Sequence, residues 1–184
     1  MTTTVDLCNA ALAKIGAPPI ATLDDESEPA RLCKRRIDAV RDAVLRAHPW
    51  NCATARARLT ADLAAPPFGF AHKFLPPADC LRVAAVEGGV AFRVEGGRIL
   101  ADAESLDVVY VRRPADPAVF DALLRETIAA RLAAELAYPL VNSSALAESL
   151  WRLYELRLRE ARGIDAQEDG EPVAPASSWI AARA

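Results

Sequence analysis

Apolar residues recur at every third or fourth position in four segments of the chain, and this spacing places them on one face of an α-helix. The segments cover 4–15, 28–47, 117–138 and 144–162. A glycine or proline follows each one closely and predicts where the helix ends. These residues are Gly16, Pro49, Pro139 and Gly163. The pattern therefore predicts two pairs of amphipathic helices.

Between the second and third helical segments the apolar residues form short runs, separated by Pro-Pro and Gly-Gly pairs, which is typical of strands and turns. The predicted strands are 81–86, 90–95, 98–101 and 106–112, with a further strand somewhere in 53–75. Gly88-Gly89 and Gly96-Gly97 stand where two-residue hairpin turns would lie, because glycine adopts positive φ without strain. We expect a small antiparallel meander.

Amphipathic helices need partners, so the four helices are expected to pack together. The predicted fold is α+β and mainly α: a four-helix bundle with a small antiparallel β module inserted between helices 2 and 3, followed by an extended C-terminal tail. Residues 1–49 and 114–163 would form the bundle, 50–113 the β module, and 164–184 a docking tail. The tail is acidic and rich in proline, yet it ends in an apolar Trp179-Ile180 pair, a pattern often found in docking peptides.

The segment His48-Pro-Trp-Asn-Cys52 lies where the helical pattern gives way to strands. Pro49 resists helical conformation in the residue before it and so ends the second helix. The large apolar ring of Trp50 is suited to fill the joint between helices and strands. Asn51 can satisfy backbone groups at such a turn. We therefore interpret Pro49, Trp50 and Asn51 as a structural corner.

Composition and charge narrow the range of functions. The chain has 184 residues, of which 52 % are apolar, with 22 Lys+Arg against 25 Asp+Glu and a net charge of -3. This balance argues against a sequence-specific DNA-binding protein, and the basic run Arg31, Lys34, Arg35 and Arg36 is interpreted as a solvated or subunit-facing surface. The sequence contains no long uncharged apolar stretch, so we expect no membrane segment.

Two arrangements of cysteine and histidine were weighed as chemical sites. His48 and Cys52 are four residues apart, but Pro49 interrupts the helix that would align them, and His72 and Cys80 lack the close spacing of structural zinc sites. A nucleophilic Cys52 or Cys80 needs an oriented base, and His72 has no flanking motif that marks one. We therefore expect reduced, buried cysteines, no catalytic, cofactor or metal site, and no enzymatic activity. A thiol hydrolase that uses Cys52 or Cys80 remains as an alternative function.

Several landmarks occur along the chain in a characteristic order. They are ALAKIGAPPI at 11–20, an acidic loop before the second helix, HPWN at 48–51, FLPPADCLRV at 74–83, LAAELAYPL at 132–140 and the terminal SSWIAARA. This series resembles the tail tubular protein A family of tailed phages, whose members are head-to-tail adaptors, also called gatekeeper proteins. The resemblance spans almost the whole chain. Family members often have Phe where this chain has Cys52.

The resemblance implies a structural virion protein at the head-tail junction, made in the host cytoplasm. Such adaptors form a homo-oligomeric ring, usually of twelve subunits, under the portal protein. The ring extends the DNA channel, lets double-stranded DNA pass without specific binding, and gives the downstream tail or nozzle protein its platform. Within this scheme we expect Trp179, Ile180 and Arg183 to contact the portal or a neighbouring subunit. The alternative from another functional class of protein is a small helical DNA-binding regulator.

Overall fold

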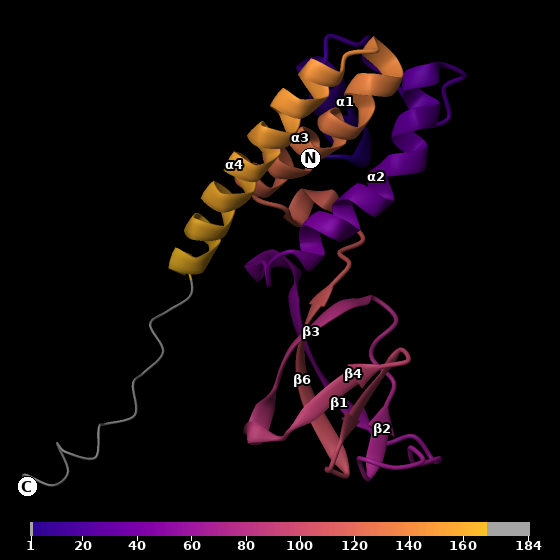
Figure 1. Cartoon of the computed structure of the whole chain (residues 1–184), viewed down its shortest axis with the longest axis vertical. Coiled ribbons are helices and arrows are strands. Elements are labelled where there is room, and N and C mark those ends of the chain that lie inside the picture. Colours follow the sequence, from indigo (N-terminus) through magenta and orange to yellow (C-terminus); the bar gives the residue numbers. More distant parts are fainter. Residues whose placement is uncertain (1, 169–184) are drawn as a thin grey trace, which may run out of the picture.

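The computed structural model describes residues 2–168 and shows an α+β protein, as predicted. Helices lie at one end of its long axis and strands at the other (Figure 1). The helices are α1 (Thr4–Lys14), α2 (Glu28–Arg46), α3 (Ala122–Val141) and α4 (Ser144–Glu168). All the strands lie between α2 and α3 in chain order.

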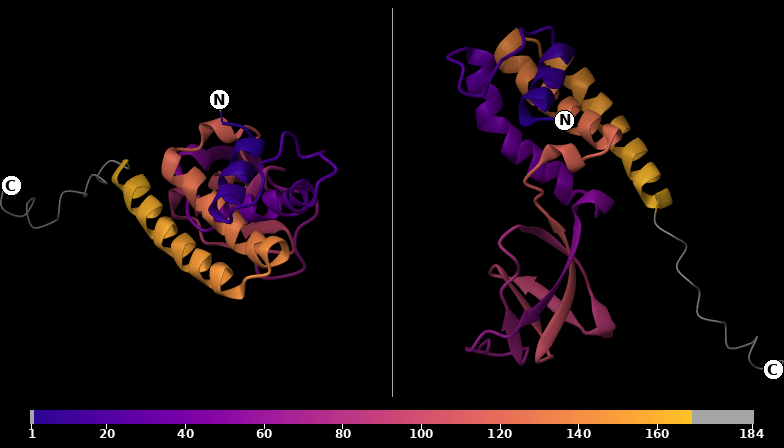
Figure 2. Two further views of the ribbon diagram at one scale, coloured as in Figure 1. Left: turned by 90° about the horizontal axis from the view of Figure 1, so that it is seen from above. Right: turned by 180° about the vertical axis from the view of Figure 1, so that it is seen from behind.

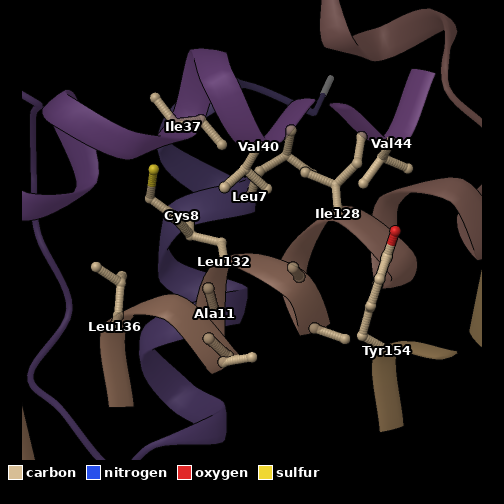
Figure 3. Packing of buried hydrophobic residues seen from close by; sticks show 14 of the residues in the cluster. Leu7, Cys8, Ala11, Ile37, Val40, Val44, Ile128, Leu132, Leu136 and Tyr154 are labelled. Atoms are coloured by element: carbon tan, nitrogen blue, oxygen red, sulfur yellow. The ribbon is translucent and has the colours of Figure 1, made fainter. Parts of the chain in front are cut away.

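Helix α3 is the centre of the helical part. It packs against each of the other three helices, and α4 runs along the outside of this group (Figure 2). The α3 side chains Leu124, Ile128, Leu132 and Leu136 are fully buried. Small alanines between them allow the neighbouring helices to approach closely, and Figure 3 shows residues of α1, α2 and α4 converging on this core. The apolar stripe predicted from the sequence thus describes only part of a helix that is buried on most sides.

A side chain caps each of the four helices, and the Ser143 hydroxyl does so for α4 by accepting from the Leu146 amide at 3.2 Å. Thr3 and Asp6 form a capping box at the start of α1. The Ser27 hydroxyl accepts from the Ala30 amide at the start of α2. Asp121 caps α3 through the Leu124 amide. These caps satisfy amide groups that have no partner inside the helix.

The strands form two three-stranded antiparallel sheets rather than the single meander expected. They are β1 (Thr54–Thr60), β2 (His72–Phe74), β3 (Cys80–Val86), β4 (Phe92–Glu95), β5 (Arg98–Ala101) and β6 (Ser105–Arg112). One sheet has the order β1-β6-β3 and the other β2-β5-β4. The meander was wrong because β1 and β3 both pair with the distant β6, and local patterning does not encode such pairing.

The two Gly-Gly pairs behave differently. Gly96-Gly97 forms the predicted two-residue hairpin, with Glu95 opposite Arg98 and both glycines at positive φ. Gly88-Gly89 is not a hairpin turn, because the strands on either side of it belong to different sheets. It lies in a short 3₁₀ turn (Glu87–Gly89) that carries the chain from one sheet to the other.

The boundaries of two helices, α3 and α4, also differ from the prediction. A 3₁₀ turn occupies Pro117–Val119, so α3 begins later than expected. Helix α3 also continues past Pro139 to Val141. Helix α4 does not stop at Gly163 but runs to Glu168. The bundle boundary predicted at 163 and the extended tail predicted from 164 were therefore placed too early. The remainder of that predicted tail, 169–184, lies outside the described residues.

The buried side chains form two clusters. One joins the four helices and includes Trp50 and Ala53, from the segment between α2 and β1, and Val111 from β6. The other lies between the two sheets and includes Phe74, Ile99 and Leu106. Strand β6 contributes to both clusters, so it links the helical part to the β part.

Candidate functional site

The predicted structural corner lies where α2 leads into β1. Trp50 is completely buried in the helical cluster, and its indole Nε1 donates to the Val44 carbonyl at 3.1 Å. Val44 belongs to the last turn of α2, and its carbonyl also accepts from the Ala47 amide at 3.1 Å. The ring of His48 packs edge-on against the indole, with centroids 4.8 Å apart. Pro49 is exposed and Thr54 donates to its carbonyl at 3.3 Å.

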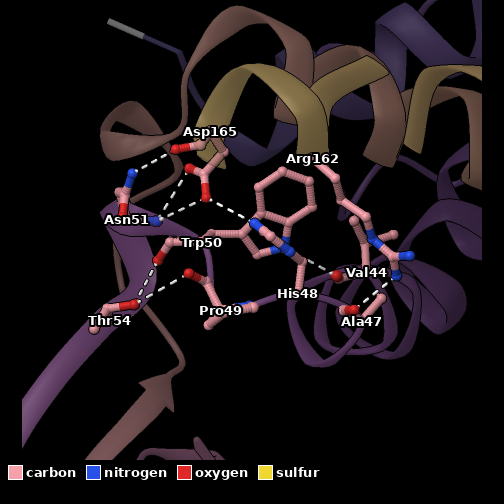
Figure 4. A network of polar contacts seen from close by, with 9 residues as sticks. All are labelled: Val44, Ala47, His48, Pro49, Trp50, Asn51, Thr54, Arg162 and Asp165. Atoms are coloured by element: carbon pink, nitrogen blue, oxygen red, sulfur yellow. Dashed lines mark hydrogen bonds and ion pairs between the residues drawn. The ribbon is translucent and has the colours of Figure 1, made fainter. Parts of the chain in front are cut away.

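Asp165, near the end of α4, is the centre of a polar network at this corner (Figure 4). Its carboxylate is only 6 % exposed and lies 2.9 Å from His48 Nε2. The carboxylate also accepts from the backbone amide of Asn51 at 3.1 Å. The side-chain amide of Asn51 donates to the backbone carbonyl of Asp165 at 2.9 Å. A buried carboxylate is tolerated when it is hydrogen-bonded in this way. The network joins residues more than a hundred positions apart in sequence.

Arg162 adds a second contact between α4 and the end of α2. Its Nη2 donates to the Ala47 carbonyl at 2.6 Å. Ala47 is the C-cap residue of α2, where a positive charge also interacts favourably with the helix dipole. We name the set His48, Asn51, Arg162 and Asp165 the corner clasp. It fixes the last turns of α4 against the joint between helices and strands.

Sequence reasoning missed Asp165, which it assigned to an extended acidic tail. A signal was present, however. Leu150, Tyr154, Ala161 and Asp165 are spaced by four, seven and four positions, so they continue one helical face past Gly163. Gly163 itself has no positive φ, and it therefore does not form the left-handed cap that would end a helix.

Two further contacts hold the strands to α2. The Arg113 guanidinium, just after β6, pairs with Asp42 of α2 at 2.6 Å. Arg46 at the end of α2 donates to the Leu81 carbonyl of β3. Together with the corner clasp, these contacts restrain how the sheets are oriented relative to the helices.

The cysteines are free thiols in the structure. Burial raises the pKa of the Cys52 thiol to about 11 and also raises the pKa of Cys80. A nucleophilic cysteine needs a lowered pKa, so both shifts have the wrong sign for the hydrolase alternative. Within residues 2–168, no group of three or more His, Cys, Asp or Glu side chains is placed to hold a metal ion.

The exposed arginines of β1 are paired with acids. Arg58 makes a two-pronged contact with Asp107 at 2.6 and 2.7 Å, and this hydrogen bonding lowers the pKa of the Asp107 carboxyl. Arg56 pairs with Glu87 at 3.0 Å. These side chains line one shallow groove, and the acids in it oppose phosphate binding.

An uncharged loop lies at the free end of the β part, far from the helices (Figure 1). This tip loop comprises residues 63–71, LAAPPFGFA, with Leu63 fully exposed and Phe68 87 % exposed. Its base is fixed, because the Asp62 amide donates to the Lys73 carbonyl at 2.8 Å and the Ala71 amide to Asp102 at 2.7 Å. Exposed apolar side chains on a fixed base are typical of a contact surface.

The predicted partner-binding residues Trp179, Ile180 and Arg183 lie outside the described residues. Among the described helices, none combines the length and apolarity needed to cross a membrane. No family model matches the chain, and no curated protein shows significant similarity to it.

Trp50→Ala is expected to lower the free energy of unfolding by about 3–5 kcal/mol, because it leaves a cavity and removes the bond to Val44. Urea unfolding measures this loss. Trp151→Ala is the matched control and should cost less, since Trp151 is 38 % exposed. A change near zero for Trp50→Ala would mean that Trp50 does not fill the corner.

Asp165→Ala is expected to cost about 1–3 kcal/mol, because it leaves the Asn51 amide without its acceptor. Glu168→Ala removes a carboxylate from the same helix end but is exposed, so it should change stability by less than about 0.5 kcal/mol. Urea unfolding compares the two variants. Equal losses would show that helix-end charge, and not the corner clasp, sets the effect.

Alkylation of Cys52 by iodoacetamide at pH 8 is expected to be about a hundredfold slower in the folded protein than in the urea-unfolded chain. The raised pKa leaves only about one thiol in a thousand as thiolate at that pH, so the rate should rise about tenfold per pH unit until the pH approaches 11. Peptide mass spectrometry follows the modification. A fast, pH-independent reaction near neutrality would support the nucleophile alternative instead.

Proposed function

We propose that this chain is a structural head-to-tail adaptor of a tailed phage, assembled as a ring under the portal protein. The observation that carries the proposal is the ordered series of sequence landmarks, which resembles one adaptor family along almost the whole chain. In this role the protein extends the DNA channel and supports the next tail protein. It performs no chemistry of its own.

Several structural features support an assembly role. The tip loop exposes apolar side chains at one end of the molecule, and α4 exposes Leu156 and Ile164 on its outer side. Apolar residues in such positions are covered in many assemblies by neighbouring subunits. A closed ring needs two different contact faces on each subunit. The outer side of α4 is suited to be one of these faces, and the tip loop lies on a different part of the molecule, where it is free for another partner.

We assign the tip loop to the downstream tail protein and the segment 169–184 to the portal or the neighbouring subunit. Trp179, Ile180 and Arg183 are the proposed contacts in that segment, because buried Trp and Arg side chains dominate many interfaces. The corner clasp lies only a few residues before this segment. It therefore fixes the last described turns of α4, which precede the segment in sequence.

The charge distribution suits a conduit for DNA. Each phosphate that a protein neutralises adds salt-dependent affinity and would hinder sliding. The net charge is -3, and the exposed arginines of β1 are paired with acids. These features disfavour the alternative of a DNA-binding regulator.

Co-expression with the portal protein of the same phage tests the proposal. We expect the two proteins to co-purify and electron microscopy to show a ring of this protein on the portal. Deletion of 169–184 should abolish the complex while leaving thermal unfolding unchanged. The deletion begins after Glu168 so that Asp165 keeps its place in the corner clasp.

The variant Leu63→Ser/Phe68→Ser is the matched control. It alters the tip loop, so it should still bind the portal but lose the downstream tail protein. Portal binding that survives the deletion would refute the assigned docking segment. If the chain does not bind the portal but binds short duplex DNA with a steep salt dependence, the result would support the DNA-binding regulator instead.

A further inference from the structure

Two cysteines face each other inside the helical core. Cys8 lies on α1 and Cys33 on α2, both have 0 % exposure, and both belong to the cluster that joins the helices. Figure 3 shows the Cys8 sulfur directed toward α2. Hydrogen bonding between the two thiols is the main cause of the shift in the pKa of each. Both are reduced in the structure.

The neighbouring elements allow the sulfurs to stay together. α1 and α2 are in direct contact and both pack on α3. On α2 the buried face runs through Cys33, Ile37, Val40 and Val44, so Cys33 points into the core and not toward solvent. On α1 the neighbours Leu7, Ala11 and Leu12 are buried in the same way. The pair is therefore held in place by the helices on which it lies.

We propose that Cys8 and Cys33 form a disulfide bond when the folded protein meets a thiol oxidant. This bond would staple α1 to α2. The inference rests on the placement of the two cysteines and is independent of the proposed function. Cys52 and Cys80 have no such thiol partner among their contacts, since their pKa shifts come mainly from burial.

The reaction can be written with oxidised glutathione as the oxidant. The thiolate of one cysteine attacks one glutathione sulfur, which forms a mixed disulfide and releases one glutathione thiolate. The other cysteine then gives up its proton to water, and its sulfur attacks the sulfur of the first cysteine and releases the second glutathione. Two cysteine thiols are oxidised, and one glutathione disulfide is reduced to two thiols.

Only a thiolate attacks a disulfide, so one thiol of the pair must first lose its proton. Because both sulfurs are buried, the first step requires a transient local opening, of the kind that occurs in folded proteins.

The consequence is a covalently closed loop. It would include the acidic connection between α1 and α2, which is otherwise fixed by Asn9 through two hydrogen bonds to Ile20. Closing this loop reduces the conformational freedom of the unfolded chain. The oxidised protein should therefore resist denaturant better than the reduced protein.

The test is incubation of the full chain with oxidised glutathione, followed by unfolding, alkylation of the remaining thiols and tryptic mass spectrometry. We expect the peptide that ends at Lys14 joined to the peptide that ends at Lys34, with Cys52 and Cys80 alkylated. We also expect the urea midpoint to rise on oxidation and to return to its original value after reduction.

Two variants act as controls. Cys33→Ala should abolish the cross-link and the shift in midpoint. Cys52→Ala/Cys80→Ala should keep both. The proposal is overturned if folded protein ends with four alkylated cysteines, or if Cys8 pairs with Cys52 or Cys80. It is also overturned if the folded protein yields the same mixture of pairings as the chain oxidised in urea.

Discussion

The burial of the Trp50 indole against the last turn of α2 is the constraint on which the arrangement of helices and strands depends. It places a large apolar ring where the chain changes direction and satisfies a helix-end carbonyl at the same time. The corner clasp then closes around it, because Asp165 reaches from α4 to Asn51 and His48. Apolar burial supplies the stability of this joint, and the polar contacts supply its geometry.

Two ion pairs near the joint connect different elements. Asp165 from α4 meets His48, and Asp42 from α2 meets Arg113 after β6. Such pairs contribute little to stability when exposed, but they penalise arrangements in which a partner is missing. They therefore select one orientation of the sheets. A fixed orientation matters for a protein that we propose to act as one segment of a ring.

The sequence predicts where helices and strands lie along the chain better than it predicts which of them pair or pack together. The stripe Leu124–Leu136 locates α3, and the Gly96-Gly97 hairpin follows from local chemistry. The two-sheet topology could not be predicted, because β6, the last strand, pairs with β1 and β3, which are distant in sequence. The corner clasp was missed for a related reason. Asp165 looked like part of an acidic tail, and only the folded chain shows the buried turn that it enters.

Strand β6 has a consequence for how the protein unfolds. It is the middle strand of its sheet, it packs Leu106, Val108 and Tyr110 into the strand cluster, and it extends Val111 into the helical cluster. Neither part can therefore lose its core without disturbing a strand that the other needs. Two regions that look separable in outline are joined into one cooperative unit, and a load applied to the strands is transmitted to the helices through the backbone of β6.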